Sequence, residues 1–168
     1  MRTLASHAAG RFNIIEVNKL SEDTRKVGST EIRHDLNTGQ IDKANQQLGY
    51  IYSIDGIVVH GEKRGRELGY PTANIKFSHY ARLPMEGVYV CEFLVGGHVY
   101  PAMGSIGHND TFGAGGQLTM EINILDFHQD IYGEQVSVRW LHLIREQVKF
   151  DGAQALIKQL EADAETTR

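Results

Sequence analysis

From Tyr50 onward, apolar and polar residues alternate in a series of short segments, and this alternation restricts the fold more than any other feature of the sequence. Side chains that alternate with a period of two are typical of β-strands that bury one face. Strands this short at this spacing predict an antiparallel barrel, because closure removes exposed sheet edges. Gly96 and Gly97 predict a hairpin turn between two of the strands. The predicted strands cover residues 51–60, 87–95, 98–106, 118–125 and 135–144.

The N-terminal part of the chain is more polar and carries signals for helices. Ser29 can cap a helix over residues 30–37, which Gly39 ends. A second short helix is predicted over residues 41–48, with Gly49 as its stop. The barrel is therefore expected to follow a short α-rich segment.

The sequence also predicts a C-terminal helix. Asp151 is a candidate N-cap, and Gln154 is its candidate partner in a capping box. An apolar stripe along this helix predicts packing against the barrel. The stripe consists of Ala153, Leu156, Ile157, Leu160 and Ala164.

Composition argues against several classes of protein. The formal net charge of −4 provides no basic field for bulk nucleic-acid binding. No apolar run approaches the roughly 18 residues of a membrane span, and the N-terminus lacks the apolar core of a secretion signal. Cys91 is the only cysteine, so no intrachain disulfide is possible, and its strand pattern predicts a buried small hydrophobe. Together these features favour a protein of the reducing cytoplasm.

Residues 61–74 form the segment richest in chemical signals. The segment holds three glycines and three basic side chains, and a proline precedes Thr72 and Asn74. Glycines let backbone N–H groups approach an anion, and a hydroxyl and an amide offer oxygen ligands to Mg²⁺. The segment could bind a nucleotide–metal complex or could be only a solvated turn. Its glycines are spaced by four, so it matches neither the Walker pattern nor the dinucleotide-binding pattern.

Glu121 is the candidate catalytic carboxylate. Strand alternation places it on one face with Thr119 and Asn123, and it could be either a solvent-facing charge or a group at the barrel mouth. A carboxylate there can accept a proton from a substrate hydroxyl. Phosphoryl transfer needs a metal on the phosphates and a group that orients the nucleophile. Thr72, Asn74 and Glu121 could supply these functions if the fold brings them together.

Three other features allow two interpretations each. Residues 108–112 could form an Asx-type turn or line a pocket beside Thr72. Arg145 could bind a phosphate with its forked guanidinium or stack on an aromatic ring. Phe150 could cover an apolar ligand or pack before the terminal helix. The eight histidines show no spacing that indicates a zinc site.

Taken together, these motifs resemble the riboflavin kinase (flavokinase) family over residues 50–163. A Pro-Thr-Ala-Asn run after a glycine-rich loop, followed by a Glu, a Leu-Asp-Phe and a Tyr-Gly, is a specific combination. The resembling segments are residues 56–61, 64–66, 68–74, 84–89, 106–112, 120–121, 125–127, 131–133, 143–145 and Phe150.

The resemblance implies a mainly β fold, a six-stranded antiparallel Greek-key barrel with a C-terminal α-helix. It also implies transfer of the ATP γ-phosphate to the ribityl 5′-hydroxyl of riboflavin, giving FMN and ADP. Thr72 and Asn74 would hold Mg²⁺, and Thr72 would also contact ATP. Gly61 and Arg66 would contact the ATP phosphates, and Glu121 would be the base that orients the ribityl hydroxyl.

The same resemblance assigns the remaining substrate contacts. Ile124 and Tyr132 would border the adenosine. Arg145, Val148 and Phe150 would lie on a mobile flap over the flavin. The implied partners are riboflavin or FMN and ATP or ADP, with no nucleic acid and no membrane.

In bacteria this kinase commonly follows an FMN adenylyltransferase domain, and residues 27–33 and 44–49 resemble the end of that domain. Residues 12–17 resemble its last strand. The expected organisation is a remnant of that domain over residues 1–48 and the kinase domain over residues 49–168. Because the front motifs of the adenylyltransferase are missing, we expect no FAD synthesis by this chain alone. A monomer is expected, with possible self-association through the remnant.

One departure from the family pattern supports an alternative function. The family usually has Asn-Pro-Thr-Phe where this chain has Asn-Asp-Thr-Phe at residues 109–112. Loss of the proline loosens the turn, and Asp110 adds a negative charge near anionic ATP. The alternative is a non-catalytic flavin-binding or regulatory module. The complete bifunctional enzyme is disfavoured by the missing motifs.

Overall fold

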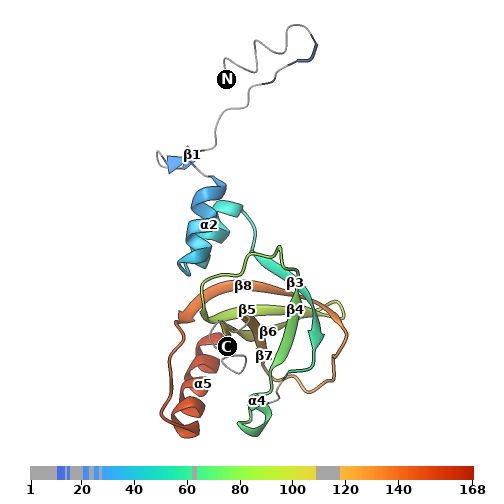
Figure 1. Ribbon diagram of the computed structural model, residues 1–168, viewed down its shortest axis with the longest axis vertical. Coiled ribbons are helices and arrows are strands. Elements are labelled where there is room, and N and C mark those ends of the chain that lie inside the picture. Colours follow the sequence, from blue (N-terminus) through green and yellow to red (C-terminus); the bar gives the residue numbers. More distant parts are fainter. Residues whose placement is uncertain are drawn as a thin grey trace.

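A computed structural model describes residues 11–13, 15, 21–22, 25–26, 28–61, 64–108 and 118–168. Six antiparallel strands close into a barrel in the order β3-β4-β7-β6-β5-β8 (Figure 1). The barrel strands are β3 (Ser53–Val59), β4 (Ala73–Phe77), β5 (Gly87–Val95), β6 (His98–His108), β7 (Leu118–Ile124) and β8 (Gln135–Arg145). The other elements are the paired β1 (Ser21–Glu22) and β2 (Arg25–Lys26), and the helices α2 (Ser29–Asn37), α3 (Ile41–Leu48), α4 (Arg64–Glu67) and α5 (Ala153–Thr167). The expected six-stranded antiparallel barrel with a C-terminal helix is confirmed.

The barrel core follows from the alternation in β5. Tyr89, Cys91 and Phe93 are all buried, and the Tyr89 ring meets the Trp140 ring of β8 edge-on at 5.3 Å. Gly104 of β6 makes room for them, because a Cβ there would lie 2.7 Å from the Cys91 sulfur and 2.8 Å from the Trp140 ring. Close packing of this kind leaves no space for even a methyl group.

Burial in the core changes the acidity of two groups. It raises the pKa of the Cys91 thiol well above its ordinary value, and a backbone hydrogen bond at Gly104 offsets only part of this shift. Burial also raises the pKa of the Tyr89 phenol, whose oxygen donates a hydrogen bond to the Met85 carbonyl. Cys91 is a free thiol that behaves as the buried small hydrophobe the sequence predicted.

The strand β4 was missed by the alternation argument. It is only five residues long, and of its residues only Ile75 is fully buried, so no clear periodicity appears. Pairing with β3 on one side and β7 on the other fixes β4 in the barrel. Tertiary pairing therefore creates a strand here that the local pattern does not show.

The N-terminal helices lie where the sequence predicted them, but the N-cap of α2 differs from the prediction. Helix α3 covers the predicted residues and ends at Gly49, whose φ of 73° suits glycine. Helix α2 begins at Ser29 itself, with Gly28 as its N-cap and no side-chain cap, so the prediction that Ser29 caps it was wrong. The strand expected over residues 12–17 is absent at Phe12, Asn13 and Ile15, and the rest of that segment lies outside the described residues.

Helices α2 and α3 share the hydrophobic core of the barrel and lie at one end of it (Figure 1). Leu36 and Ile41 are 2% and 0% exposed and belong to the same buried cluster as the barrel residues. The Asn45 amide donates to the Trp140 carbonyl at 2.9 Å, and the backbone N–H of Met85 donates to the Leu36 carbonyl at 2.8 Å. The domain boundary expected between residues 48 and 49 remains a prediction. In the structure, helices α2 and α3 pack against the barrel.

Helix α5 packs against β6 and β5. Its N-cap is Gly152 with a φ of 118° and no side-chain cap, so the capping box predicted from Asp151 was wrong. The predicted stripe is only half-buried along most of its length, and Ala153 is exposed. The buried residues of the helix are Asp163, Ala164 and Thr167, near its C-terminal end.

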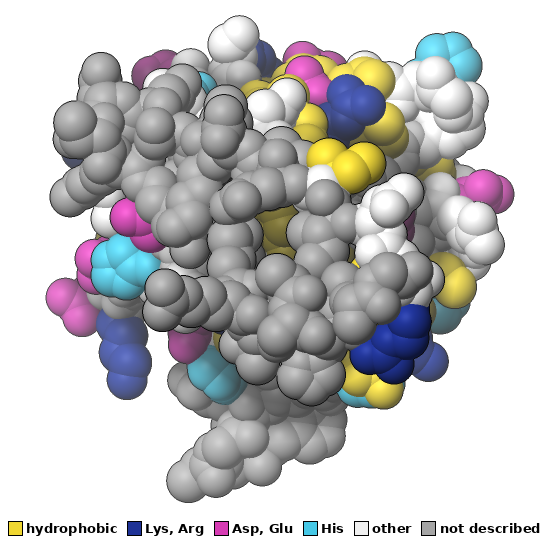
Figure 2. Space-filling model, turned by 90° about the horizontal axis from the view of Figure 1, so that it is seen from above, with side chains coloured by type: hydrophobic (Ala, Val, Ile, Leu, Met, Phe, Trp, Pro, Cys, Tyr) yellow, Lys and Arg dark blue, Asp and Glu magenta, His cyan; other side chains and the backbone are white. Residues whose placement is uncertain are grey.

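Charges are mixed on the one face of the molecule that Figure 2 shows. On the face shown in Figure 2, the described acidic, basic and histidine side chains are interspersed rather than gathered by sign. None of the helices in the described part of the chain has the length and apolar character needed to span a lipid bilayer.

Candidate active site

Strand register brings the predicted catalytic and metal-binding residues together. The pairing of β4 with β7 sets Asn74 opposite Glu121. Thr72, immediately before β4, donates a hydrogen bond from Oγ1 to Glu121 Oε2 at 3.1 Å. Although Thr72 and Glu121 are 49 positions apart in the sequence, the closed barrel places them in contact. Glu121 is half-buried and its carboxylate accepts a hydrogen bond from Thr72, which favours a group at the barrel mouth over a solvent-facing charge.

Glycine is required at two points of the preceding loop. A Cβ at Gly61 would overlap the side-chain amide of Asn74, so the absence of a side chain at 61 allows Asn74 to lie there. A Cβ at Gly65 would overlap the Tyr70 carbonyl, and the backbone N–H of Tyr70 donates to the Gly65 carbonyl at 2.9 Å. The glycines of this loop therefore permit close packing of the backbone around Asn74 and Tyr70.

A buried asparagine that the sequence reasoning did not select fixes the approach to Thr72. Asn123 is 8% exposed, and its side-chain amide donates to the Pro71 carbonyl at 2.8 Å. Pro71 restricts the backbone, so this hydrogen bond holds the segment that carries Thr72 against β7. Strand alternation places Asn123 on the polar face with Glu121, so the local pattern carried no signal for this role.

An open pocket lies beside this cluster. It brings together four of the five residues expected to contact ATP: Arg66, Thr72, Ile124 and Tyr132. A guanidinium nitrogen of Arg66 donates to the Tyr132 hydroxyl at 3.3 Å, and the Tyr132 ring lies 3.8 Å from the His60 ring. The other lining residues are Val58, Pro71, Ala73, Ile122, Phe127, Gln129, Asp130 and Ile131.

The lining of this pocket suits a nucleotide. Aliphatic and aromatic side chains such as Ile124 and Tyr132 can contact a base, while the Arg66 guanidinium can pair with phosphate oxygens. Thr72 is shared between this pocket and Glu121. A phosphate placed near Thr72 would therefore lie beside the carboxylate.

The donor set also suits Mg²⁺. Among the described residues, no group of three His, Cys, Asp or Glu side chains could hold a metal ion by itself. Thr72 and Asn74 instead offer a hydroxyl and an amide oxygen, and Glu121 adds a carboxylate beside them. Mg²⁺ usually takes only a few protein oxygens and fills its octahedron with substrate phosphates and water. These residues therefore fit a magnesium ion that arrives with a nucleotide.

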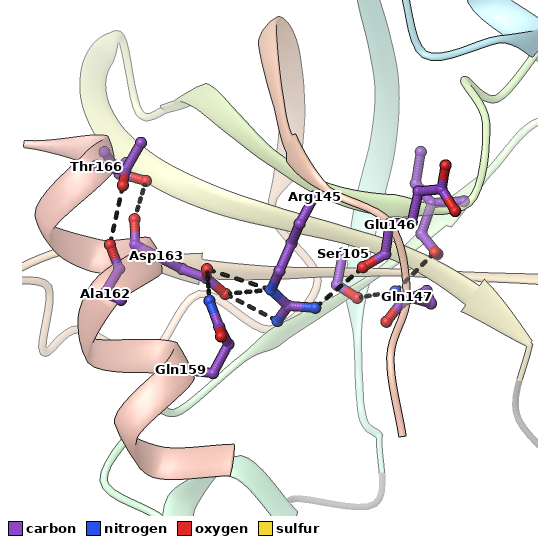
Figure 3. Close-up of polar contacts among 10 residues, drawn as sticks. Ser105, Arg145, Glu146, Gln147, Gln159, Ala162, Asp163 and Thr166 are labelled. Carbon is purple, nitrogen blue, oxygen red and sulfur yellow. Dashed lines mark hydrogen bonds and ion pairs between the residues drawn. The ribbon is translucent and has the colours of Figure 1, made fainter. Parts of the chain in front are cut away.

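Arg145 ends β8 and begins the segment expected to cover the flavin. Its guanidinium donates to Asp163 of α5 from both Nε and Nη2, the latter at 2.8 Å (Figure 3). Its Cζ lies 5.5 Å from the centre of the Phe150 ring, a cation–π arrangement. Of the two interpretations of Arg145, stacking on an aromatic ring is therefore observed, and the guanidinium fork is occupied by Asp163.

The segment after Arg145, residues 146–150, is called the strap below. Val148 in the strap is 52% exposed, and Phe150 is half-buried. Gln147 donates from Nε2 to the Ser105 hydroxyl and to the Ile106 carbonyl, both at 2.9 Å. The strap thus contacts β6, while Arg145, immediately before it, contacts α5.

The turn over residues 108–112 is described only at its first residue. His108 ends β6, and its Nδ1 lies 3.0 Å from a carboxylate oxygen of Glu86. Residues 109–112, including Asp110, lie outside the described residues.

Comparisons with known proteins agree with this geometry. Residues 48–168 match the riboflavin kinase (flavokinase) family model. The chain is 44% identical over 168 residues to a bifunctional riboflavin kinase/FMN adenylyltransferase of Listeria monocytogenes, covering 100% of this chain and 54% of that protein. It is 38% identical over 165 residues to the Bacillus subtilis protein described in the same words, covering 97% of this chain and 52% of the relative.

A solved structure from Streptococcus pneumoniae, described as a macrolide-efflux protein, has a TM-score of 0.84 and 43% identity. The match covers 90% of this chain and 50% of that one. The chain spans about half the length of the curated relatives it matches. The family model covers most of the chain, and the relatives extend the similarity over the N-terminal helices. The chain therefore belongs to the riboflavin kinase family.

Proposed function

We propose that this chain is a riboflavin kinase, which transfers the γ-phosphoryl group of ATP to the ribityl 5′-hydroxyl of riboflavin and yields FMN and ADP. The observation that carries the proposal is the contact between Thr72 Oγ1 and Glu121 Oε2, beside a pocket suited to a nucleotide. Phosphoryl transfer requires alignment, charge neutralisation and an oriented nucleophile more than covalent chemistry. This cluster offers all three within one rim of the barrel.

The nucleotide binds in the pocket between the glycine-rich loop and β7. Ile124 and Tyr132 contact the adenosine, and Arg66 pairs with the phosphates, assisted by the backbone at Gly61. The γ-phosphate then lies near Thr72. This placement is supported by the shared position of Thr72 in the pocket and in the Glu121 contact.

Thr72 and Asn74 would hold Mg²⁺ through their side-chain oxygens. The ion would supply neutralisation of the charge that develops on the transferred phosphoryl group and the departing ADP. Glu121 accepts a hydrogen bond from the ribityl 5′-hydroxyl and takes its proton as the new O–P bond forms and the bond to ADP breaks. Before riboflavin binds, Thr72 occupies one oxygen of this carboxylate and keeps it oriented.

Riboflavin binds on the strap side of Glu121. Arg145, Val148 and Phe150 cover the flavin, and the exposed apolar side chain of Val148 is available for that contact. We also propose that the chain acts as a monomer in the cytoplasm, where Cys91 remains a reduced, buried thiol.

The direct test is FMN formation from riboflavin, ATP and Mg²⁺, with the flavins separated by charge. Replacement Glu121→Gln keeps the shape and removes the base, so we expect the rate to fall by about 10²-fold or more. A Glu31→Gln variant, which changes a charge in the first turn of α2, serves as a matched control. Equal rates for Glu121→Gln and the unaltered chain would contradict the role of Glu121. Riboflavin binding without turnover by the unaltered chain would favour the non-catalytic module instead.

A further inference from the structure

Helix α5 holds the strap through one buried ion pair. The Asp163 side chain is 1% exposed and that of Arg145 is 17% exposed, so most of their interaction lies away from solvent. Asp163 Oδ2 accepts from Arg145 Nε at 3.0 Å and from Nη2 at 2.8 Å, and Gln159 donates to Oδ1 at 2.8 Å (Figure 3). A charge-assisted pair of this geometry fixes the plane of the guanidinium.

The fixed guanidinium in turn contacts the strap at two points. Arg145 Nη1 donates to the Glu146 carbonyl at 3.2 Å, which sets the direction in which the chain leaves β8. Its Cζ lies 5.5 Å from the Phe150 ring at the other end of the strap. The orientation that Asp163 imposes on Arg145 is therefore passed on to both ends of residues 146–150.

A second anchor attaches the middle of the strap to the barrel beside the catalytic carboxylate. Gln147 Nε2 donates to the Ser105 hydroxyl and to the Ile106 carbonyl. Ser105 is the cross-strand partner of Glu121 in the pairing of β6 with β7. A chain of polar contacts thus leads from α5, through Arg145 and the strap, to the residue beside Glu121.

We infer that Asp163 is a positioning residue, which holds Arg145 so that the strap lies beside Glu121 and is ready to cover riboflavin. This inference rests on the proposed kinase function. Asp163 does not touch the substrates, and it acts only through Arg145. A purely structural ion pair would instead stabilise the fold without changing the affinity for riboflavin.

The test compares Asp163→Asn with the unaltered chain. The substitution keeps the volume and removes the charge, so Arg145 loses its ionic partner and turns toward solvent. We expect the KM for riboflavin to rise about tenfold or more, because charge-assisted hydrogen bonds of this kind contribute on that scale. The KM for ATP should change by less than about twofold, since the nucleotide pocket is built on other strands.

Two further variants and a second readout keep the test decisive. Gln147→Ala removes the second anchor through an exposed side chain, so it folds even if Asp163→Asn does not, and it should produce a smaller rise in riboflavin KM. Thr166→Ala, on the same helix, removes a hydroxyl that donates to the Ala162 carbonyl; it is the matched control and should change neither KM. Trypsin cleavage after Lys149, an exposed residue of the strap, reports strap position without any reaction and should accelerate in Asp163→Asn.

The two proposals fail in different ways. An unaltered chain that makes no FMN overturns the kinase function. The positioning role is then decided by riboflavin binding, measured by quenching of flavin fluorescence: weaker binding and faster cleavage after Lys149 in Asp163→Asn support it, and unchanged binding overturns it. An unchanged riboflavin KM in both Asp163→Asn and Gln147→Ala overturns the positioning role while the kinase function stands. Faster cleavage in Asp163→Asn with an unchanged KM for riboflavin also overturns the positioning role. Asp163 would then hold the strap without affecting how riboflavin binds.

Discussion

The two sides of the proposed active site are built by different means. On the nucleotide side, backbone pairing sets Asn74 opposite Glu121 and brings Thr72 into contact with its carboxylate. On the flavin side, the strap has no strand partner, and side chains from Arg145 and Gln147 attach it to α5 and β6. Strand register cannot shift by less than one residue, whereas a side-chain anchor can release. From this difference we expect the nucleotide side to be fixed and the flavin side to be able to open for substrate.

The largest effect is expected on the nucleotide side, from Gly61→Ala. The new Cβ would overlap the Asn74 amide and displace it from Glu121 and the proposed metal position. A displacement of about 1 Å at a reacting centre can cost on the order of 10²-fold in rate, so we expect a loss of that size in kcat/KM for ATP.

Gly28→Ala is the control for this change, because a Cβ at Gly28 would meet no atom of the described residues within 4 Å. Steady-state kinetics with ATP varied and riboflavin saturating would measure the effect. A Gly61→Ala variant with unaltered kinetics would mean that the loop tolerates movement. The nucleotide side would then be no more rigid than the flavin side.

A smaller effect is expected on the strap side, from Phe150→Leu. The change keeps an apolar side chain but removes the ring over which Arg145 lies. We expect the KM for riboflavin to rise about threefold to tenfold, since aromatic and cation–π contacts contribute on that scale. The KM for ATP provides an internal control. A larger change in the KM for ATP than for riboflavin would remove the distinction between the two sides.

The same comparison explains what could be predicted from the sequence. Five of the six barrel strands were predicted because each buries one face and therefore alternates. The β4 strand, which carries Asn74, was not, because it is short and its position depends on pairing with β3 and β7. The family resemblance, and not the periodicity, supplied the sixth strand. The metal-binding role expected for Thr72 and Asn74 came first from their side-chain oxygens and then from the resemblance.

Asp163 shows why the strap side was harder to predict. It lies three positions after Leu160 and four before Thr167, so it shares the packed face of α5. A single acidic residue on an apolar face was the signal for a buried ion pair, but only the fold could identify Arg145 as its partner. The N-caps of α2 and α5 were each predicted at a neighbouring residue, because glycine takes the cap position in both.

The central claim is that Thr72 and Glu121 act as one unit because the barrel places their side chains in contact. A double-mutant cycle with Thr72→Val and Glu121→Gln, measured as the rate of FMN formation, tests this claim most directly. When two residues act together, the effects of substituting them are not additive. The double variant should therefore lose little more activity than the Glu121→Gln single variant. Losses that multiply as if the two side chains were independent would contradict the account.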